Sequence, residues 1–219
     1  MERRMFLLAV VVPFFLAAVD LFAQDEAPAP TYQQGDFWLF RVNEKDMVPQ
    51  STAALSGVYD VMFVEGQFRV GRPGREPFPG RQEIGELLAM LSNPSDAMQY
   101  LQFPLAVGKK WKANYQITFR GANRAMNRTG DNAVTGIETV ATPAGRFRSF
   151  KIERQDTGGV GPPGMDPPRM ASTYYYSPDA RCVVKYHLEV LSQTGSNLGT
   201  RDIEVVKFGS KGAVKRPPQ

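Results

Sequence analysis

The residues that most often carry catalytic or metal chemistry are sparse in this sequence. Histidine occurs once, as His187, and cysteine occurs once, as Cys182. A serine–histidine–acid triad would have to use His187, but no motif places a nucleophile around it. The two residues lie five positions apart on one predicted strand, so their side chains point to opposite faces and cannot share a zinc ion. We therefore expect His187 on a strand surface and Cys182 in the core.

Carboxylates are numerous, but their pattern does not indicate a catalytic pair. The acidic residues that we considered, all at positions predicted to be solvated, are Glu83, Glu86, Asp131 and Asp156. Hydrolases of the glycosidase type need two facing carboxylates, which no motif brings together. The glycine- and proline-rich stretch 156–170 lacks the lysine–serine pair and the helix start of a phosphate-binding loop. We therefore predict no enzyme activity, no catalytic residue, no metal ion and no cofactor, and keep a hydrolase only as a third alternative.

Basic and aromatic residues interleave within residues 136–154. The basic residues are Arg146, Arg148, Lys151 and Arg154, with Phe147 and Phe150 between them. Such a pattern can bind nucleic acid, but predicted export argues against that partner and leaves anionic lipid, lipopolysaccharide or an acidic protein. The alternative is a solvated strand face. The residues that we predict as candidates for ligand or partner contact are Trp111, Tyr115, Arg146, Arg148, Phe150, Tyr174 and Tyr176.

The N-terminus has the three parts of a secretory signal peptide. Arg3 and Arg4 precede an apolar run from Met5 to Val19, and Ala23 supplies a small residue for cleavage. The apolar run has 15 residues. Because a membrane-spanning helix needs roughly 20, we favour a cleaved signal over residues 1–23 to an uncleaved anchor. We expect an exported protein, periplasmic or extracellular, that does not span the membrane after cleavage.

Composition predicts one domain between two short tails. Residues 24–34 have few apolar side chains and predict a disordered lead-in, residues 35–209 a single β-rich domain, and residues 210–219 a disordered basic tail. The formal net charge of +4 at pH 7 indicates a mild preference for anionic surfaces, not a dedicated polyanion site. One cysteine forbids an internal disulfide, so the core must hold the fold together.

Hydropathy patterns predict a mainly β protein with about eight or nine strands and one helix. The clearest strand spans residues 111–119, where apolar odd positions alternate with polar even positions. A helical period occurs near residues 82–92, where apolar residues recur at i, i+3, i+4 and i+7. Residues 121–132 predict a polar connection between strands, and residues 156–170 an exposed loop.

The stretch 136–154 predicts a central hairpin whose register is ambiguous. Pro143 suits the second position of a type I turn and Gly145 the position after it, which together predict a three-residue loop with a glycine bulge. Matching of apolar side chains favours a register tighter by one residue, with Val140 opposite Phe147. We expect a further bulge to reconcile the two patterns.

Three segments resemble a large group of exported bacterial proteins of unknown function. They are FPLAVGKKW (103–111), GIETVATPAGRFRSFKIER (136–154) and YYYSPDARCVVKY (174–186). The resemblance implies a strongly curved antiparallel sheet, a half-barrel or open barrel similar to the periplasmic lipoprotein carriers, which hold acyl chains against a helix. It implies no catalytic residues, and residues 24–100 match no known pattern.

These observations favour a non-enzymatic exported β-domain. Our leading hypothesis is that it binds an apolar or amphipathic ligand, such as a lipid, or a partner protein in the concavity of its sheet. A structural or assembly protein of the cell envelope, acting through exposed strand edges and residues 156–170, is the alternative. Nucleic acid is not an expected partner.

Overall fold

The computed structural model describes residues 26–46, 56–74, 78–79, 91, 99–118, 125–158 and 167–210. All regular secondary structure in these ranges is β-strand. The predicted signal peptide, the tail from residue 211 onward and the predicted helix, apart from Leu91, lie outside the described residues. Within the described ranges there is no helix with the length and hydropathy to cross a membrane.

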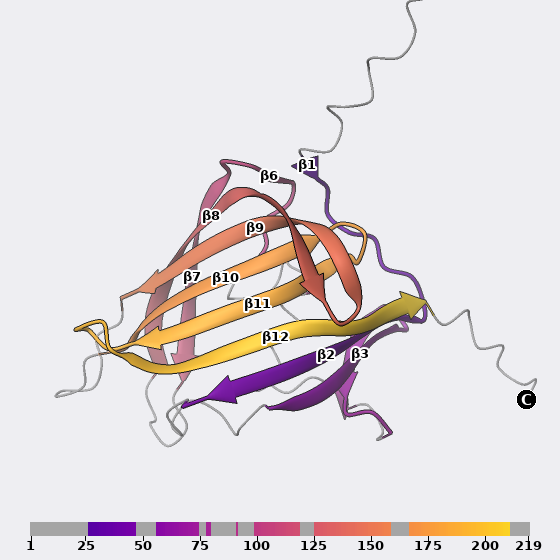
Figure 1. The fold of residues 1–219 in the computed structure, drawn as a ribbon, viewed down its shortest axis with the longest axis horizontal. Coiled ribbons are helices and arrows are strands. Elements are labelled where there is room, and N and C mark those ends of the chain that lie inside the picture. The colour runs from indigo at the N-terminus through magenta and orange to yellow at the C-terminus, as the bar shows by residue number, and fades with distance from the viewer. Residues whose placement is uncertain are drawn as a thin grey trace, which may run out of the picture.

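The strands are β1 (Glu26–Ala27), β2 (Asp36–Lys45), β3 (Gly57–Val64), β4 (Gln67–Gly71), β5 (Phe78–Pro79), β6 (Leu105–Ala106), β7 (Lys110–Thr118), β8 (Ala125–Thr142), β9 (Gly145–Thr157), β10 (Arg169–Ser177), β11 (Cys182–Leu191) and β12 (Asn197–Ser210). Ten of them form one sheet in the order β5-β4-β3-β2-β12-β11-β10-β9-β8-β7, and β1 pairs with β6 (Figure 1). Every pairing in the sheet is antiparallel. The mainly β, antiparallel prediction is therefore confirmed for the described residues.

The strands alternate between a buried face and an outer face. On β7, Trp111, Ala113 and Tyr115 are buried while Lys110 and Lys112 are exposed, as the sequence predicts. The buried face of the sheet holds the core, in which Phe40, Ile152 and Tyr186 of β2, β9 and β11 are buried. The alternation thus decides which residues of each strand can form a site inside the molecule.

The β8–β9 hairpin adopts the register that apolar matching favours. Thr142 pairs with Gly145 and Val140 with Phe147, so the loop has two residues and the predicted three-residue loop is wrong. Both apolar partners are buried, and a slip by one residue would move them to the opposite face. The register shifts by one residue between Val134 and Gly136. The sequence predicts a further bulge in this hairpin but does not give its position.

Strand β8 is longer than the sequence predicts. It begins at Ala125, so much of the predicted polar connection 121–132 pairs as strand with β7 and β9. Hydropathy alternation misses this part because the inward residues Arg128, Gly130 and Asn132 are not apolar. The prediction of a polar connection is therefore wrong for residues 125–132. These residues instead bring Arg128, Gly130 and Asn132 to the buried face.

Part of the predicted lead-in, residues 24–34, is packed against the sheet. Ala27 pairs with Leu105 and is buried. The Tyr32 ring lies edge-on to Trp38 and to Phe68, with centroids 5.5 and 4.9 Å away. One aromatic side chain thus anchors a segment whose overall composition is polar, where we had expected disorder.

The predicted loop 156–170 is shorter in the described structure. Strand β9 continues through Asp156 to Thr157, and β10 starts at Arg169. Residues 159–166 lie outside the described ranges.

Figure 1 shows the β8–β9 hairpin bending over the sheet towards β12, where the rings of Phe147 and Phe208 lie 5.6 Å apart.

Candidate functional site

A cluster of polar side chains lies on the buried face where β7, β8 and β9 pair. The strand register places Tyr115 opposite Arg128 and Gly130 opposite Asp156. Residues two apart on a strand share a face, so alternate positions of β8 and β9 all point inward here. The residues that we call the Arg154 cluster are Tyr100, Tyr115, Arg128, Gly130, Asn132, Arg154, Asp156 and Tyr174.

Arg154 and Asp156 form a buried ion pair at the centre of this cluster. Arg154 Nε donates to Asp156 Oδ1 and Oδ2 at 3.0 and 2.9 Å, and Nη2 donates to Oδ1 at 2.8 Å. The Arg154 side chain is 1% exposed, and its guanidinium lies 4.7 Å from the centre of the Tyr100 ring and 5.0 Å from that of Tyr115. Burial by itself lowers the pKa of Arg154, but the hydrogen bonds and charge of Asp156 outweigh it and hold that pKa above its usual range.

Gly130 makes room for this ion pair. A Cβ atom at position 130 would lie 2.6 Å from Arg154 Nε and 2.6 Å from Asp156 Oδ1. Both side chains are buried, so neither can move aside into solvent. The ion pair therefore needs a residue without a side chain on the neighbouring strand.

Two tyrosine hydroxyls complete the hydrogen bonding. Tyr115 donates to Asp156 Oδ1 at 2.9 Å, and burial, together with the Asp156 charge, raises the pKa of Tyr115 so that its phenol stays neutral. The Tyr174 hydroxyl lies 2.6 Å from the Tyr100 carbonyl oxygen and 2.8 Å from Asn132 Oδ1. These contacts tie the segment at Tyr100 to the sheet.

Arg128 is a second cation of the cluster, and among the described residues it has no carboxylate partner. The residue is 2% exposed. Its Nη2 donates to the Pro168 carbonyl oxygen at 2.6 Å and, weakly, to that of Asp156 at 3.5 Å. Its Nε and Nη1 are buried and have no hydrogen-bond partner among the described residues. The cluster thus holds two guanidinium groups and one carboxylate.

A pocket opens at the rim of the sheet, beside this second arginine. The residues that line this rim pocket are Thr157, Gly158, Pro167, Pro168, Arg169 and Gln193. Pro168 is shared between the pocket wall and the hydrogen bond from Arg128. The pocket therefore combines an apolar wall, one lining arginine and a buried arginine behind it.

The chemistry available to the Arg154 cluster is binding, not proton transfer. Both oxygens of Asp156 accept hydrogen bonds from Arg154, and one also accepts from Tyr115, so the carboxylate is not available as a general base. Within the described residues, no group of three or more histidine, cysteine, aspartate or glutamate side chains could hold a metal ion.

The sequence-predicted contact residues fall into two separate places. Five of them are buried, namely Trp111, Tyr115, Phe150, Tyr174 and Tyr176. Arg146 and Arg148 are instead exposed beside the β8–β9 turn. Only Tyr115 and Tyr174 belong to the Arg154 cluster, and Trp111 contacts it through its carbonyl oxygen, which accepts a hydrogen bond from Asn132.

Sequence reasoning missed the most unusual members of the cluster. Asp156 was predicted to be solvated and is buried, which is a correction, and Arg154 was counted with the basic residues of a solvated face. The missed signal is a pair of alternating polar patterns, Arg128-x-Gly130-x-Asn132 on β8 and Arg154-x-Asp156 on β9. Such patterns indicate buried polar strand faces when the two strands are paired.

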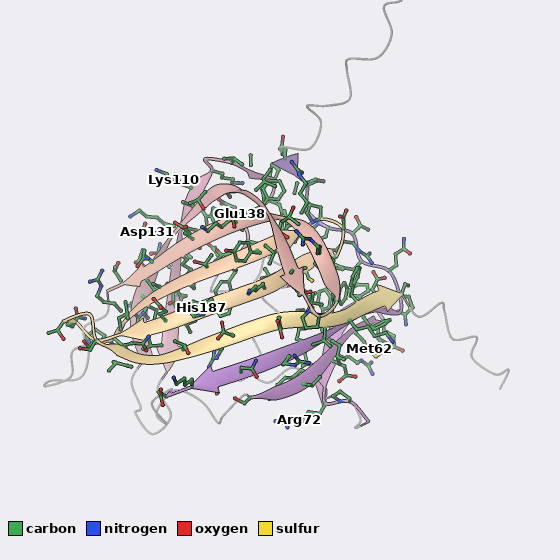
Figure 2. The ribbon with its side chains drawn as sticks, viewed as in Figure 1. Met62, Arg72, Lys110, Asp131, Glu138 and His187 are labelled. Atoms are coloured by element: carbon green, nitrogen blue, oxygen red, sulfur yellow. The ribbon has the colours of Figure 1, made fainter. Side chains whose placement is uncertain are left out.

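The single histidine and the single cysteine lie where the sequence predicts. His187 is on the outer face, where Figure 2 labels it with Asp131 and Glu138, and its Nδ1 lies 2.7 Å from Asp202 Oδ1. Cys182 is fully buried, and burial raises the pKa of its thiol. Among the described residues, no hydrogen bond or ion pair joins either side chain to the Arg154 cluster, so neither adds chemistry to it.

Comparison with known proteins gives a fold likeness only. No protein-family model matches the chain, and no curated protein matches it in sequence. A Bacteroides fragilis protein inferred to be exported, with a YmcC-like fold, is 12% identical over 84% of this chain and 100% of that chain, with a TM-score of 0.41. A Parabacteroides distasonis protein inferred to be a lipoprotein has the same identity and TM-score, over 84% of this chain and 97% of its own.

The hypothetical lipoprotein YmcC from Escherichia coli is also similar. It is 10% identical over 83% of this chain and 90% of that chain, with a TM-score of 0.34. All three TM-scores are below 0.5, so these similarities do not indicate a function.

Proposed function

We propose that this chain is a non-enzymatic, exported binding domain for an amphipathic organic anion, which it holds at the rim pocket. The rim pocket supports this proposal because Pro167 and Pro168 offer apolar contact while Arg169 offers a positive charge. A ligand with an apolar part and a carboxylate or phosphate matches both features. Export is part of the proposal and rests on the predicted signal peptide.

Binding at the rim replaces the expected position of the ligand inside the sheet. The described part of the buried face is occupied by the protein's own side chains, among which Leu101 and Leu105 are 0% exposed. Phe103 packs on Tyr176 with ring centroids 5.1 Å apart. An acyl chain would have to displace these residues, whereas the rim pocket needs no such displacement.

Within the described residues, no free catalytic group lies at the rim pocket, and this favours binding over catalysis. Asp156, which directly precedes the lining residue Thr157 in sequence, is engaged by Arg154 and Tyr115. Among the residues that the structure describes, those that line the pocket include no histidine, cysteine or carboxylate. A hydrolase would need at least one such group in place.

Titration with matched octyl compounds tests the proposal. Sodium octanoate and 1-octanol share a chain length and differ in charge, and amide NMR spectra of the folded protein report where each binds. We expect octanoate to shift the signals of Gly158, Arg169 and Gln193, and octanol to shift them only at higher concentration. If neither compound shifts these signals, the proposed function is wrong.

A second candidate function is contact with an acidic envelope protein through the β8–β9 turn. Arg146 and Arg148 are exposed there, beside a hairpin that bends over the sheet (Figure 1). Crosslinking in intact cells from a residue placed at Ala144 would capture such a partner. Replacement of both arginines by glutamate should then abolish the crosslink, and an unchanged crosslink would exclude this surface.

A further inference from the structure

We infer that Arg128 is the anchor for a single anionic group, carboxylate or phosphate, which enters from the rim pocket. This inference deepens the proposed function and uses the same pocket, but it makes a separate claim about which residue recognises the charge. It rests on the charge balance of the Arg154 cluster and on the hydrogen bonds that Arg128 does not make.

Counted over the described residues, the charge balance of the cluster leaves one positive charge without an opposite charge. Arg128 and Arg154 carry two charges, and Asp156 supplies one opposite charge that Arg154 already engages with three hydrogen bonds. A guanidinium group cannot lose its proton at any ordinary pH. Because an unpaired buried charge is costly, a counter-ion at Arg128 would stabilise the fold substantially.

The hydrogen bonds that Arg128 lacks also indicate that an anion binds beside its guanidinium group. Of its five N–H donors, those on Nε and Nη1 are buried and without a partner among the described residues. Nearly all buried polar groups in proteins have a partner, and an exception calls for an ion or a water molecule. Carboxylates and phosphates suit a guanidinium group best, because their oxygens accept several charge-assisted hydrogen bonds.

A route to Arg128 runs past Pro168. The Pro168 carbonyl oxygen accepts the hydrogen bond from Arg128 Nη2, and Pro168 itself lines the rim pocket. An anion that displaces this carbonyl oxygen would gain the guanidinium while keeping its apolar part in the pocket. Arg169, at the pocket wall, adds a second positive charge along this route.

Stability in the presence of simple anions tests the anchor. Sodium acetate or sodium phosphate is exchanged for sodium chloride at constant ionic strength, and the Tm of the wild type is compared with those of Arg128→Met and Arg146→Met. The Arg146→Met control loses the same charge at an exposed position. We expect both anions to raise the Tm of the wild type and of Arg146→Met by more than that of Arg128→Met, because exclusion of the anion from the surface acts on all three proteins, whereas a bound anion adds stability only where it binds.

A wild-type measurement keeps the inference falsifiable if Arg128→Met does not fold. The side-chain Nε–H signal of Arg128, assigned by through-bond correlations, should shift as acetate or phosphate is added. An unchanged signal would overturn the inference, as would an equal Tm response of the wild type and Arg128→Met.

Octanoate separates failure of the anchor from failure of the proposed function. We expect Arg128→Met to bind octanoate at least about tenfold more weakly than the wild type, since a hydrogen bond to a charged group contributes about 1.5–3 kcal/mol. Wild-type affinity in this variant would exclude the anchor and leave the rim pocket as the binding site. Binding of acetate and phosphate without tighter binding of octanoate would keep the anchor and exclude an amphipathic ligand.

Discussion

At the scale of single residues, Gly130 shows how a missing side chain permits a buried ion pair. We expect Gly130→Ala to lower the free energy of unfolding by about 1–3 kcal/mol or more, because its Cβ would overlap Arg154 and Asp156. Gly136→Ala on the same strand is the matched control, since a Cβ there meets nothing within 4 Å. Denaturant unfolding should show the control within about 0.5 kcal/mol of the wild type, and equal losses in both variants would contradict the steric account.

The Asp156 carboxylate offers a second prediction at this scale. Asp156→Asn should cost about 3–5 kcal/mol of stability, because it leaves the Arg154 and Arg128 charges buried without a counter-charge. Asp131→Asn breaks an ion pair with Lys112 whose side chains are 51% and 72% exposed, so it should cost less than about 1 kcal/mol. Urea unfolding of the two variants measures the difference, and comparable losses would show that the buried pair has no special role.

At the scale of elements, the sequence predicts strands well where burial follows hydropathy. Strand β7 was predicted from the alternation of its aromatic and lysine residues, and the described part follows that alternation through Tyr115. The start of β8 was missed because Arg128 and Asn132 are polar residues that point inward. Only the pairing with β9 makes these positions buried, and pairing between strands is not a local property of either sequence.

In the hairpin between β8 and β9, the matching of apolar side chains, and not the turn residues, agrees with the strand register. Turn chemistry and apolar matching predicted registers that differ by one residue, and the register in the structure pairs Val140 with Phe147. Burial of two apolar side chains contributes a few kcal/mol, whereas the choice between loop types is a smaller effect. Gly145 accommodates the tighter turn at a φ of 135°, which side chains rarely adopt.

A hydrogen-bonded ion pair joins the start of β2 to the turn between β10 and β11. Asp36 Oδ2 accepts from Arg181 Nη1 at 2.7 Å and from the Gln33 backbone N–H at 2.7 Å. Burial alone raises the pKa of Asp36, but these hydrogen bonds outweigh it and hold that pKa below its usual range. The ionised carboxylate therefore stabilises the folded state.

This pair predicts a dependence of stability on pH. A depressed pKa means that the unfolded state takes up the proton first, so the stabilisation is fully present above about pH 4 and is lost as the pH falls further. Between pH 7 and pH 3, the free energy of unfolding of the wild type should therefore fall by more than that of Asp36→Asn. Circular dichroism during urea unfolding at both pH values checks this, and parallel losses would exclude Asp36 as a source of the dependence.

At the scale of the whole molecule, the described part of the buried face is filled by the protein's own side chains. Segments from distant parts of the chain cover it, since Tyr32 packs near β2 and β4 while Tyr100 covers the Arg154 cluster. For the described residues, this arrangement favours the rim and the outer face as surfaces for recognition. The sequence could not reveal this because the covering residues lie outside the strands, where no periodicity marks them as buried.

Truncation of Leu101 tests whether side chains fill the buried face. Shortening a packed core residue costs more stability than shortening a residue that lines an empty cavity. Leu101 is 0% exposed, so Leu101→Ala should cost about 2–5 kcal/mol of stability. Val107→Ala, at a residue that is 52% exposed, should change stability by less than about 0.5 kcal/mol. The new cavity should also let 1-octanol raise the Tm of Leu101→Ala by more than its weak binding at the rim pocket raises the Tm of the wild type, because only the variant has apolar space inside. If octanol raised the Tm of the wild type equally, the buried face would already hold such a space, and the ligand would belong inside the sheet instead of at its rim.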